Sequence, residues 1–150
     1  MGIESKEFLL KDDNGKTRAA LTIRPDGTPG LALMDPEGHV RCSFDLGADG
    51  TPGLNLFDDE EGLRAAVAIR PDGTPGMGLF DKGNRPRLSL DMGNDGSAGV
   101  NIHGEDGNLR AALAIRADGT PALGLFDEAG KVGKSVELGT DRGPSRSAAE

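Results

Sequence analysis

The heptapeptide R-P-D-G-T-P-G at residues 24–30 recurs unchanged at residues 70–76, and it decides how this chain can fold. Pro-Asp-Gly fits a type I turn followed by a glycine in the left-handed region, which is the three-residue hairpin loop with a bulge. Variants of the heptapeptide occupy 47–53, 93–99 and 116–122, so the turn returns every 23 residues. The stretch therefore predicts a β-hairpin turn that is repeated along the chain.

A second turn signal, D-x-x-G, lies between successive copies of the first. It is clearest at residues 12–15 and 35–38. In the fourth copy Asn84 replaces the glycine, and asparagine is the residue that next best tolerates a positive φ. The neighbouring Gly83, and Gly62 in the third copy, could shift the turn by one residue. Two turns in each 23-residue unit predict that every unit is a hairpin.

Between the turns the apolar period is two, which is typical of half-buried strands. In residues 17–23, for example, Ala19, Leu21 and Ile23 share one face. The sequence therefore predicts an all-β fold of 12 short antiparallel strands, arranged as six 23-residue hairpin repeats over residues 1–138. The polar segment 139–150 is expected to be a disordered tail. The strands are expected near residues 7–12, 17–23, 30–35, 40–46, 53–57, 63–69, 76–81, 85–91, 98–102, 108–115, 122–126 and 132–138.

The repeats also alternate, so the larger unit has 46 residues and occurs three times. Odd copies carry R-A-A-L-T-I-R or a close variant, whereas even copies carry a serine and an acid, as in R-C-S-F-D-L-G. The equivalent acids Asp45, Asp91 and Glu137 are candidates for binding a cation or arginines such as Arg24. The alternative is that they are solvent-facing charges that keep strand edges soluble. A separate column of arginines is expected to pair with turn aspartates: Arg18, Arg41, Arg64, Arg87 and Arg110.

A flat sheet with one apolar face and two bare edges is not a stable soluble monomer, so the strands are expected to roll into a barrel or prism-like structure. Twelve strands make a barrel too wide for its side chains to fill. The sheet is therefore expected to be flattened and triangular, or to interlock with other subunits, or to hold an apolar molecule in its lumen. A β-trefoil and a parallel solenoid are the alternative closures. The lumen, and any ligand in it, is expected to be lined by Leu21, Ile23, Leu31, Leu33, Phe44, Leu54, Leu56, Val67, Ile69, Leu79, Leu90, Ile102, Leu113, Ile115 and Leu125. A column on the opposite face is expected to form an interface: Met34, Phe57, Phe80 and Phe126.

The unit L-x-L-x-D-x-x-G-x-x-R-x-x-L-x-I-x-x-D-G-T-P-G resembles tandem repeats of uncharacterised bacterial proteins. It is also loosely similar to YD (Rhs-type) repeats, in which a D-x-x-G turn and a later D-G turn separate paired strands. For YD repeats the resemblance implies a spiral antiparallel sheet around a hollow. The YD tyrosines are leucine or phenylalanine here, as at Leu33 and Phe57, and six units are too few for an encapsulating shell. The resemblance covers roughly residues 7–138 and implies no catalytic residue.

Composition excludes several classes of function. The formal net charge is −8, which disfavours nonspecific binding to nucleic acid or to an anionic membrane. Tyrosine and tryptophan are absent, so there are few platforms for stacking single-stranded bases. The sequence predicts no signal peptide and no membrane-spanning segment, since no apolar run is long enough, and it indicates no particular compartment.

No catalytic residue, metal site or cofactor is predicted. The two histidines, His39 and His103, occupy different repeat positions, and Cys42 stands in the apolar stripe. The turn aspartates lack the calcium-loop pattern D-x-D-x-D-G. The sequence thus predicts a non-enzymatic structural or interaction module that forms a homo-oligomer, with a trimer favoured. The alternative is a carrier of a lipid-like molecule.

Overall fold

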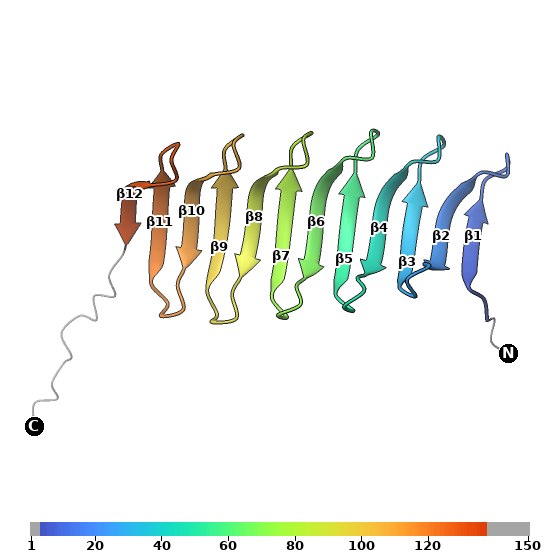
Figure 1. Ribbon diagram of the computed structural model, residues 1–150, viewed down its shortest axis with the longest axis horizontal. Helices are drawn as coiled ribbons and strands as arrows, with labels where there is room; N and C mark the ends of the chain where they lie inside the picture. Colours follow the sequence, from blue (N-terminus) through green and yellow to red (C-terminus); the bar gives the residue numbers. More distant parts are fainter. Residues whose placement is uncertain (1–3, 138–150) are drawn as a thin grey trace, which may run out of the picture.

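The computed structural model describes residues 4–137, and these residues form one antiparallel sheet of 12 strands (Figure 1). The strands follow one another in chain order, so each strand pairs only with its predecessor and its successor. Their bounds are β1 Glu7–Lys11, β2 Thr17–Ile23, β3 Pro29–Met34, β4 Val40–Leu46, β5 Pro52–Phe57, β6 Leu63–Ile69, β7 Pro75–Phe80, β8 Pro86–Met92, β9 Ala98–His103, β10 Leu109–Ile115, β11 Pro121–Phe126 and β12 Val132–Glu137. The predicted all-β hairpin fold is confirmed. The tail expected at 139–150 lies outside the described residues.

The heptapeptide turns form the predicted hairpin geometry. In the first of them the Gly27 amide donates to the Arg24 carbonyl oxygen at 2.9 Å, and Gly27 takes a φ of 86°. The Asp26 carboxylate accepts hydrogen bonds from the Thr28 amide at 3.0 Å and from the Thr28 hydroxyl at 2.7 Å. These bonds close the loop from within, so the D-G-T sequence itself sets the bulge and the register of the strands that follow.

The D-x-x-G turns keep the same geometry even where the glycine is missing. Asn84 has a φ of 58°, as expected for a substitute at the left-handed position. In the third copy Glu61 takes that position with a φ of 60°, and its amide donates to the Asp58 carbonyl oxygen at 3.2 Å. Neither Gly62 nor Gly83 shifts its turn. The hairpin register therefore overrides the unfavourable conformation of one glutamate.

We expect Glu61→Gly to stabilise the protein by about 1 kcal/mol, because glycine adopts a positive φ without the steric cost that a Cβ brings. Glu60→Gly is the matched control. Glu60 lies one residue earlier in the same turn at an ordinary φ, so glycine there should destabilise the protein slightly. The urea midpoints are to be compared at one fixed protein concentration. A lower midpoint for Glu61→Gly than for the wild type would contradict the strain argument.

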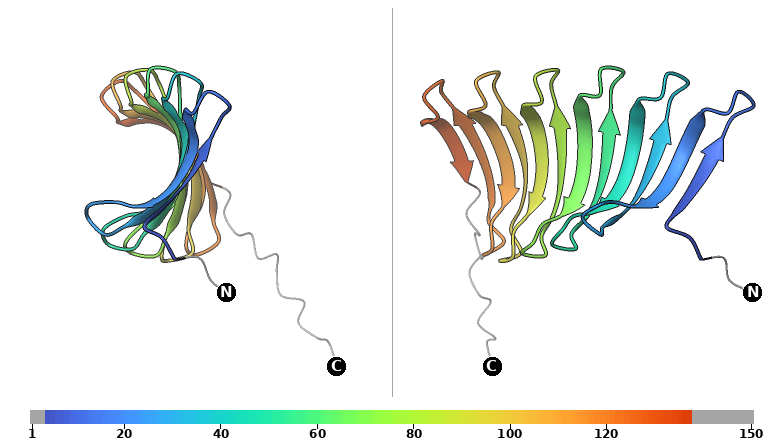
Figure 2. Two further views of the ribbon diagram at one scale, coloured as in Figure 1. Left: turned by 90° about the vertical axis from the view of Figure 1, so that its right-hand side faces the viewer. Right: turned by 45° about the vertical axis from the view of Figure 1, so that its right-hand side comes forward.

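The sheet remains open. Its strands are bent, so the sheet has the outline of a C when it is viewed along its length (Figure 2). The edge strands of the sheet are β1 and β12. The expected closure into a barrel or prism is therefore wrong for the single chain. The parallel solenoid is excluded because every pair of neighbouring strands is antiparallel. The trefoil is excluded because the twelve strands form one sheet in chain order, whose first and last strands do not pair. The curvature that accumulates over the twelve strands does not bring β1 and β12 together, so the two edge strands stay unpaired with each other.

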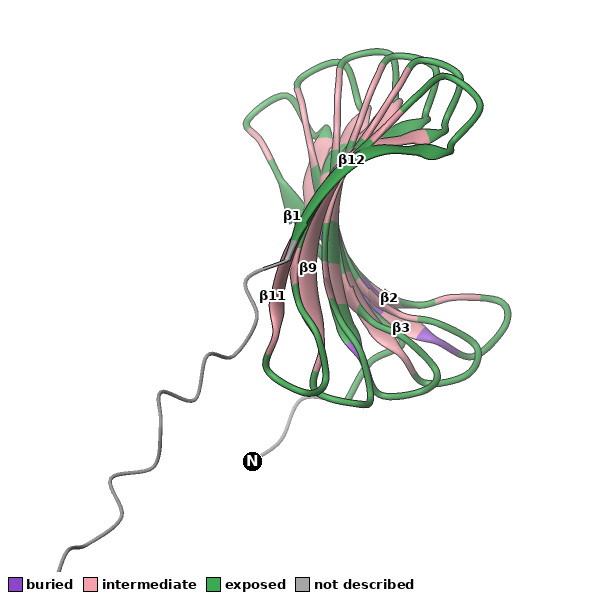
Figure 3. Cartoon of the chain, turned by 90° about the vertical axis from the view of Figure 1, so that its left-hand side faces the viewer, coloured by how far each residue is buried: buried purple, intermediate pink, exposed green. Residues whose placement is uncertain are grey.

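The described residues contain almost no hydrophobic core. Among them Ala20 is the one apolar residue that is buried, with 8% of its surface exposed. Figure 3 shows exposed and half-buried residues along nearly the whole sheet. The isolated sheet consequently lacks the main source of folding free energy, the burial of apolar surface.

Candidate functional site

One face of the sheet, the apolar face, carries nearly all of the large aliphatic side chains. Directly opposed residues of an antiparallel pair point to the same face, so the register fixes its members. Its central column runs across all twelve strands: Phe8, Leu21, Leu31, Phe44, Leu54, Val67, Met77, Leu90, Val100, Leu113, Leu123 and Val136. Columns on either side of it contain residues such as Leu33 and Ile23. The result is a continuous apolar surface along the full sheet.

All fifteen residues that were expected to line a lumen lie on this apolar face, and all of them are exposed. The sequence pattern groups them correctly on one face. The open sheet of the single chain encloses no lumen, and a role of these residues in binding a ligand stays a prediction. Cys42 also lies on the apolar face, opposite Leu33 on one side and Leu56 on the other.

The apolar face is hollowed where it crosses β6 to β10. The hollow has a volume of about 560 Å³, and Val67, Met77, Leu90, Met92, Val100 and Leu113 contribute to its lining. The position 46 residues before Leu90 is Phe44, and the position 46 residues before Val100 is Leu54. The second 46-residue unit (called here a super-repeat) therefore has smaller side chains at these two positions than the first super-repeat has, and the groove lies where they are smaller.

The opposite face, called here the small-residue face, is lined by alanine, glycine, serine and asparagine. One of its rows runs from Ala20 through Ala32, Ser43 and Asn55 to Ala66. The predicted interface column lies at one end of this face, and its four members are half-buried: Met34, Phe57, Phe80 and Phe126.

The rings of this column lie back over their own strands. A Cβ on Gly78 would lie 3.0 Å from ring atoms of Phe80, and a Cβ on Gly124 would lie 3.0 Å from ring atoms of Phe126. Each ring occupies the space above the glycine, so a side chain there would require the ring to shift. These contacts give the rings a role within the sheet, and their role in an interface stays a prediction.

The 46-residue alternation corresponds to two polar clusters on the small-residue face. In the first, Arg24 forms an ion pair with Asp45, whose other carboxylate oxygen accepts from the Ser43 hydroxyl at 2.6 Å. Arg24 also donates to the hydroxyl of the buried Thr28 at 3.3 Å. A Cβ on Gly30 would lie 2.6 Å from the Asp45 carboxylate and 2.7 Å from the Arg24 guanidinium, so the ion pair passes directly over this glycine.

The second cluster repeats the first 46 residues later. Arg70 pairs with Asp91, which accepts from the Ser89 hydroxyl at 2.6 Å and from the Asn101 amide at 3.1 Å. Partial burial raises the pKa of Asp91, but the bonds from Ser89, Arg70 and Asn101 together hold it below its usual value.

In the third super-repeat Arg116, Ala122 and Glu137 occupy the equivalent positions. Of the alternatives that the sequence offers for these acids, Asp45 and Asp91 each pair with an arginine of the Arg24 type. The acids do not converge on an axis, because four strands, about 19 Å, separate Asp45 from Asp91.

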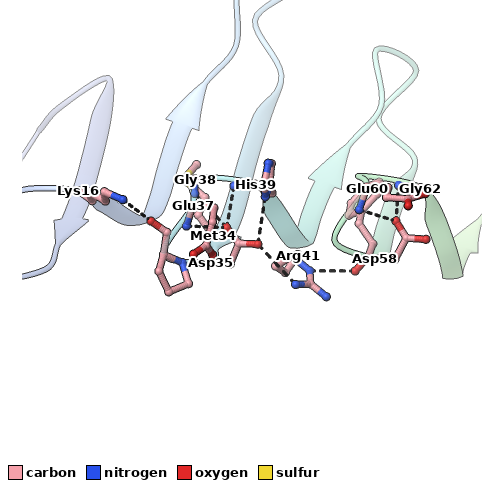
Figure 4. A network of polar contacts seen from close by, with 12 residues as sticks. Lys16, Met34, Asp35, Glu37, Gly38, His39, Arg41, Asp58, Glu60 and Gly62 are labelled. Carbon is pink, nitrogen blue, oxygen red and sulfur yellow. Dashed lines mark hydrogen bonds and ion pairs between the residues drawn. The ribbon is translucent and has the colours of Figure 1, made fainter.

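The arginine column joins successive hairpins at the end of the strands where the D-x-x-G turns lie (Figure 4). Arg41 lies 3.5 Å from the Asp35 carboxylate in its own hairpin turn and donates to the Phe57 carbonyl oxygen at 3.2 Å in the next hairpin. Asp35 also accepts from the His39 amide at 2.9 Å. The predicted pairing of this column with turn aspartates is confirmed, at N–O distances of 2.7 to 3.7 Å.

These contacts do not assemble an active site. His39 lies 3.3 Å from the Asp35 carboxylate in a turn, whereas the buried Nδ1 of His103 has no hydrogen-bond partner. The two histidines belong to β4 and β9, or to the turn beside them, and are therefore about 24 Å apart. Within residues 4–137 no group of three or more histidine, cysteine, aspartate or glutamate side chains is placed to hold a metal ion.

The chain matches no known protein family and no curated protein. The described part also contains no helix with the length and hydrophobicity needed to cross a membrane. The apolar face runs the full length of the sheet, and within residues 4–137 no other part of the chain covers it.

Proposed function

We propose that this protein is a non-enzymatic β-repeat module whose function is to self-assemble, and that copies associate through the apolar face. One observation carries the proposal: the central column of large apolar side chains is continuous across the sheet and is exposed at every strand except β9, where Val100 is half-buried. The described residues bury almost no apolar side chain of their own. Soluble monomers rarely expose contiguous apolar patches beyond a few hundred Å². The face therefore supplies, between chains, the core that the single chain lacks.

The area of the face suits a stable interface. Twelve strands at about 4.8 Å spacing extend about 55 Å, and three apolar rows span about 15 Å along the strands. The product is about 800 Å² on each copy, which is the usual contribution of one partner to a specific complex. No small ligand covers a surface of this length, but a second sheet does.

A further copy of this chain is the partner that fits the face best. Each hairpin has two strands, so the pattern of apolar side chains repeats about every 9.6 Å along the sheet, perpendicular to the strands. Only a surface with the same period keeps side chains in register with these rows over the full length. Two sheets face to face, or three sheets around an axis, satisfy this condition, and the sequence alone favours three.

Sedimentation velocity and native mass spectrometry of the purified chain test the proposal. We expect a defined homo-oligomer, together with slower modification of the Cys42 thiol by a disulfide reagent as the protein concentration rises through the assembly range. Asn14→Cys in a Cys42→Ser background is the matched control. Asn14 lies in an exposed turn, so its thiol should react at one rate at all concentrations. A folded monomer with a freely reactive Cys42 would overturn the proposal.

The groove on β6 to β10 supports a second candidate function, the binding of a lipid-like molecule. Its volume of about 560 Å³ is in the range of small-molecule sites, and its lining is almost entirely apolar. The same native mass spectra distinguish the two functions. A bound mass that is lost on denaturation would favour the carrier, whereas an oligomer of bare chains would favour self-assembly.

A further inference from the structure

The groove and the aromatic side chain at its equivalent position form a complementary pair. Of the five phenylalanines, three lie on the small-residue face and Phe8 lies on the edge strand β1. Phe44 is thus the one phenylalanine on the apolar face of the strands that follow. It stands in the central column on β4 with 55% of its surface exposed. The groove lies at the same height along the strands, since Leu90 and Val100 belong to the same column.

We propose that two copies pack apolar face to apolar face around a two-fold axis parallel to the strands, with Phe44 of each copy inserted into the groove of the other. This inference rests on the proposed function and specifies its partner and its symmetry. An axis between β6 and β7 places strand n of one copy opposite strand 13 − n of the other. β4 therefore lies opposite β9, which is one of the strands that line the groove.

The symmetry satisfies both copies at once. Such a rotation preserves height along the strands, so the central column of one sheet lies over the central column of the other. The contact is isologous: Phe44 of the first copy enters the second, and Phe44 of the second enters the first. It also keeps all twelve strands of each copy in the interface, because the axis passes through the middle of the sheet.

The other two-fold arrangement that packs the two apolar faces together leaves the groove empty. An axis along the length of the sheet places strand n opposite strand n, so that the two Phe44 rings oppose each other. The hollow over β8 and β9 then faces the same hollow of the partner. Large buried voids forfeit packing contacts, whereas a large side chain buried in a well-packed pocket is typical of interface hot spots.

Cross-linking tests the strand pairing. In a Cys42→Ser background, Leu31→Cys on β3 and Leu113→Cys on β10 are prepared as separate variants, mixed, and treated with a short bifunctional thiol reagent. Because β3 lies opposite β10 in the proposed dimer, we expect the mixed link between Leu31→Cys and Leu113→Cys chains to predominate. Predominant links between identical variants would overturn the arrangement.

Stoichiometry and side-chain truncation supply an independent test. We expect a dimer by native mass spectrometry, and a dissociation constant raised about 100-fold by Phe44→Ala. Phe8→Ala is the matched control on the same face, at the sheet edge, and should raise the constant less than 10-fold. A trimer, or equal effects of the two variants, would overturn this inference and leave self-assembly intact. A monomer would overturn both.

Discussion

Two aspartates placed in the middle of the apolar face, Leu54→Asp and Val67→Asp, should abolish assembly. The two residues oppose each other in the register of β5 and β6 and are exposed in the single chain. Each substitution removes about 1.5 to 3 kcal/mol of apolar burial. Each also leaves a carboxylate without a partner inside the interface, which costs several kcal/mol more. We expect the dissociation constant to rise at least a thousandfold.

Loss of assembly should also unfold the sheet. Because the described residues bury so little apolar surface within one chain, the separated variant is expected to lose most of its far-UV β-sheet signal. The matched control is Asn14→Asp with Asn94→Asp, which adds the same two charges at exposed turns. Sedimentation velocity and circular dichroism are measured on both variants. A double variant that keeps the wild-type oligomer would show that copies meet elsewhere, for example through the Phe57 and Phe80 column.

The hairpins could be predicted because their determinants are local. Asp26, Gly27 and Thr28 close their turn with bonds made inside it, so a short sequence suffices to identify the loop. Each strand then lies beside its neighbour by necessity. The period of two also assigns residues such as Leu21 and Leu33 to one face, whatever that face packs against.

The closure of the sheet could not be predicted in the same way. Alternation shows which side chains share a face, but it does not show whether the chain itself covers that face. The predicted lumen assumed that the covering surface came from the same chain. Whether it does depends on the curvature accumulated over twelve strands, and no single repeat encodes that curvature.

The polar clusters show the intermediate case. Arg24 and Asp45 are 21 residues apart, and the arginine reaches the acid by passing over Gly30 on the strand between them. The 46-residue alternation indicated that these residues belong together. The register was needed to show that they meet within one chain and at separate places along the sheet, instead of converging on a common axis. The positive φ of Glu61 could not be predicted from the sequence, because Gly62, one residue later, could equally have taken the left-handed position.

Acid should destabilise the protein steeply below about pH 4. Eleven aspartates have a pKa below the ordinary value, and most of them are turn residues. In Asp26 the Thr28 hydroxyl and amide are the main causes of the lowered pKa. A carboxyl group whose pKa is lower in the folded state stabilises that state above the unfolded pKa of about 3.9. This contribution disappears as pH falls through the lower, folded value.

The overall charge of the chain has the opposite effect on stability as the pH falls from 7, so the two effects can be distinguished. Between pH 7 and the isoelectric point near 4.8 the net charge of −8 falls towards zero, so general self-repulsion weakens. If repulsion dominated, stability would rise on acidification. We expect instead a nearly flat stability down to about pH 4.5, then a fall in the unfolding midpoint of about 10 °C or more by pH 3. Thermal unfolding at fixed protein concentration measures both regions.

Asparagine substitution isolates the turn carboxylates as the cause. Asp26→Asn and Asp72→Asn retain a side-chain acceptor for the turn but cannot titrate. The double variant should lose stability at pH 7, where the charged acceptors are stronger, and should show a smaller drop between pH 4.5 and pH 3. Asp59→Asn and Asp13→Asn form the control, because both residues lie exposed in the other kind of turn. An acid transition of unchanged depth in the Asp26→Asn/Asp72→Asn variant would mean that protonation elsewhere, and not the repeated hairpin turn, limits the stability of the sheet in acid.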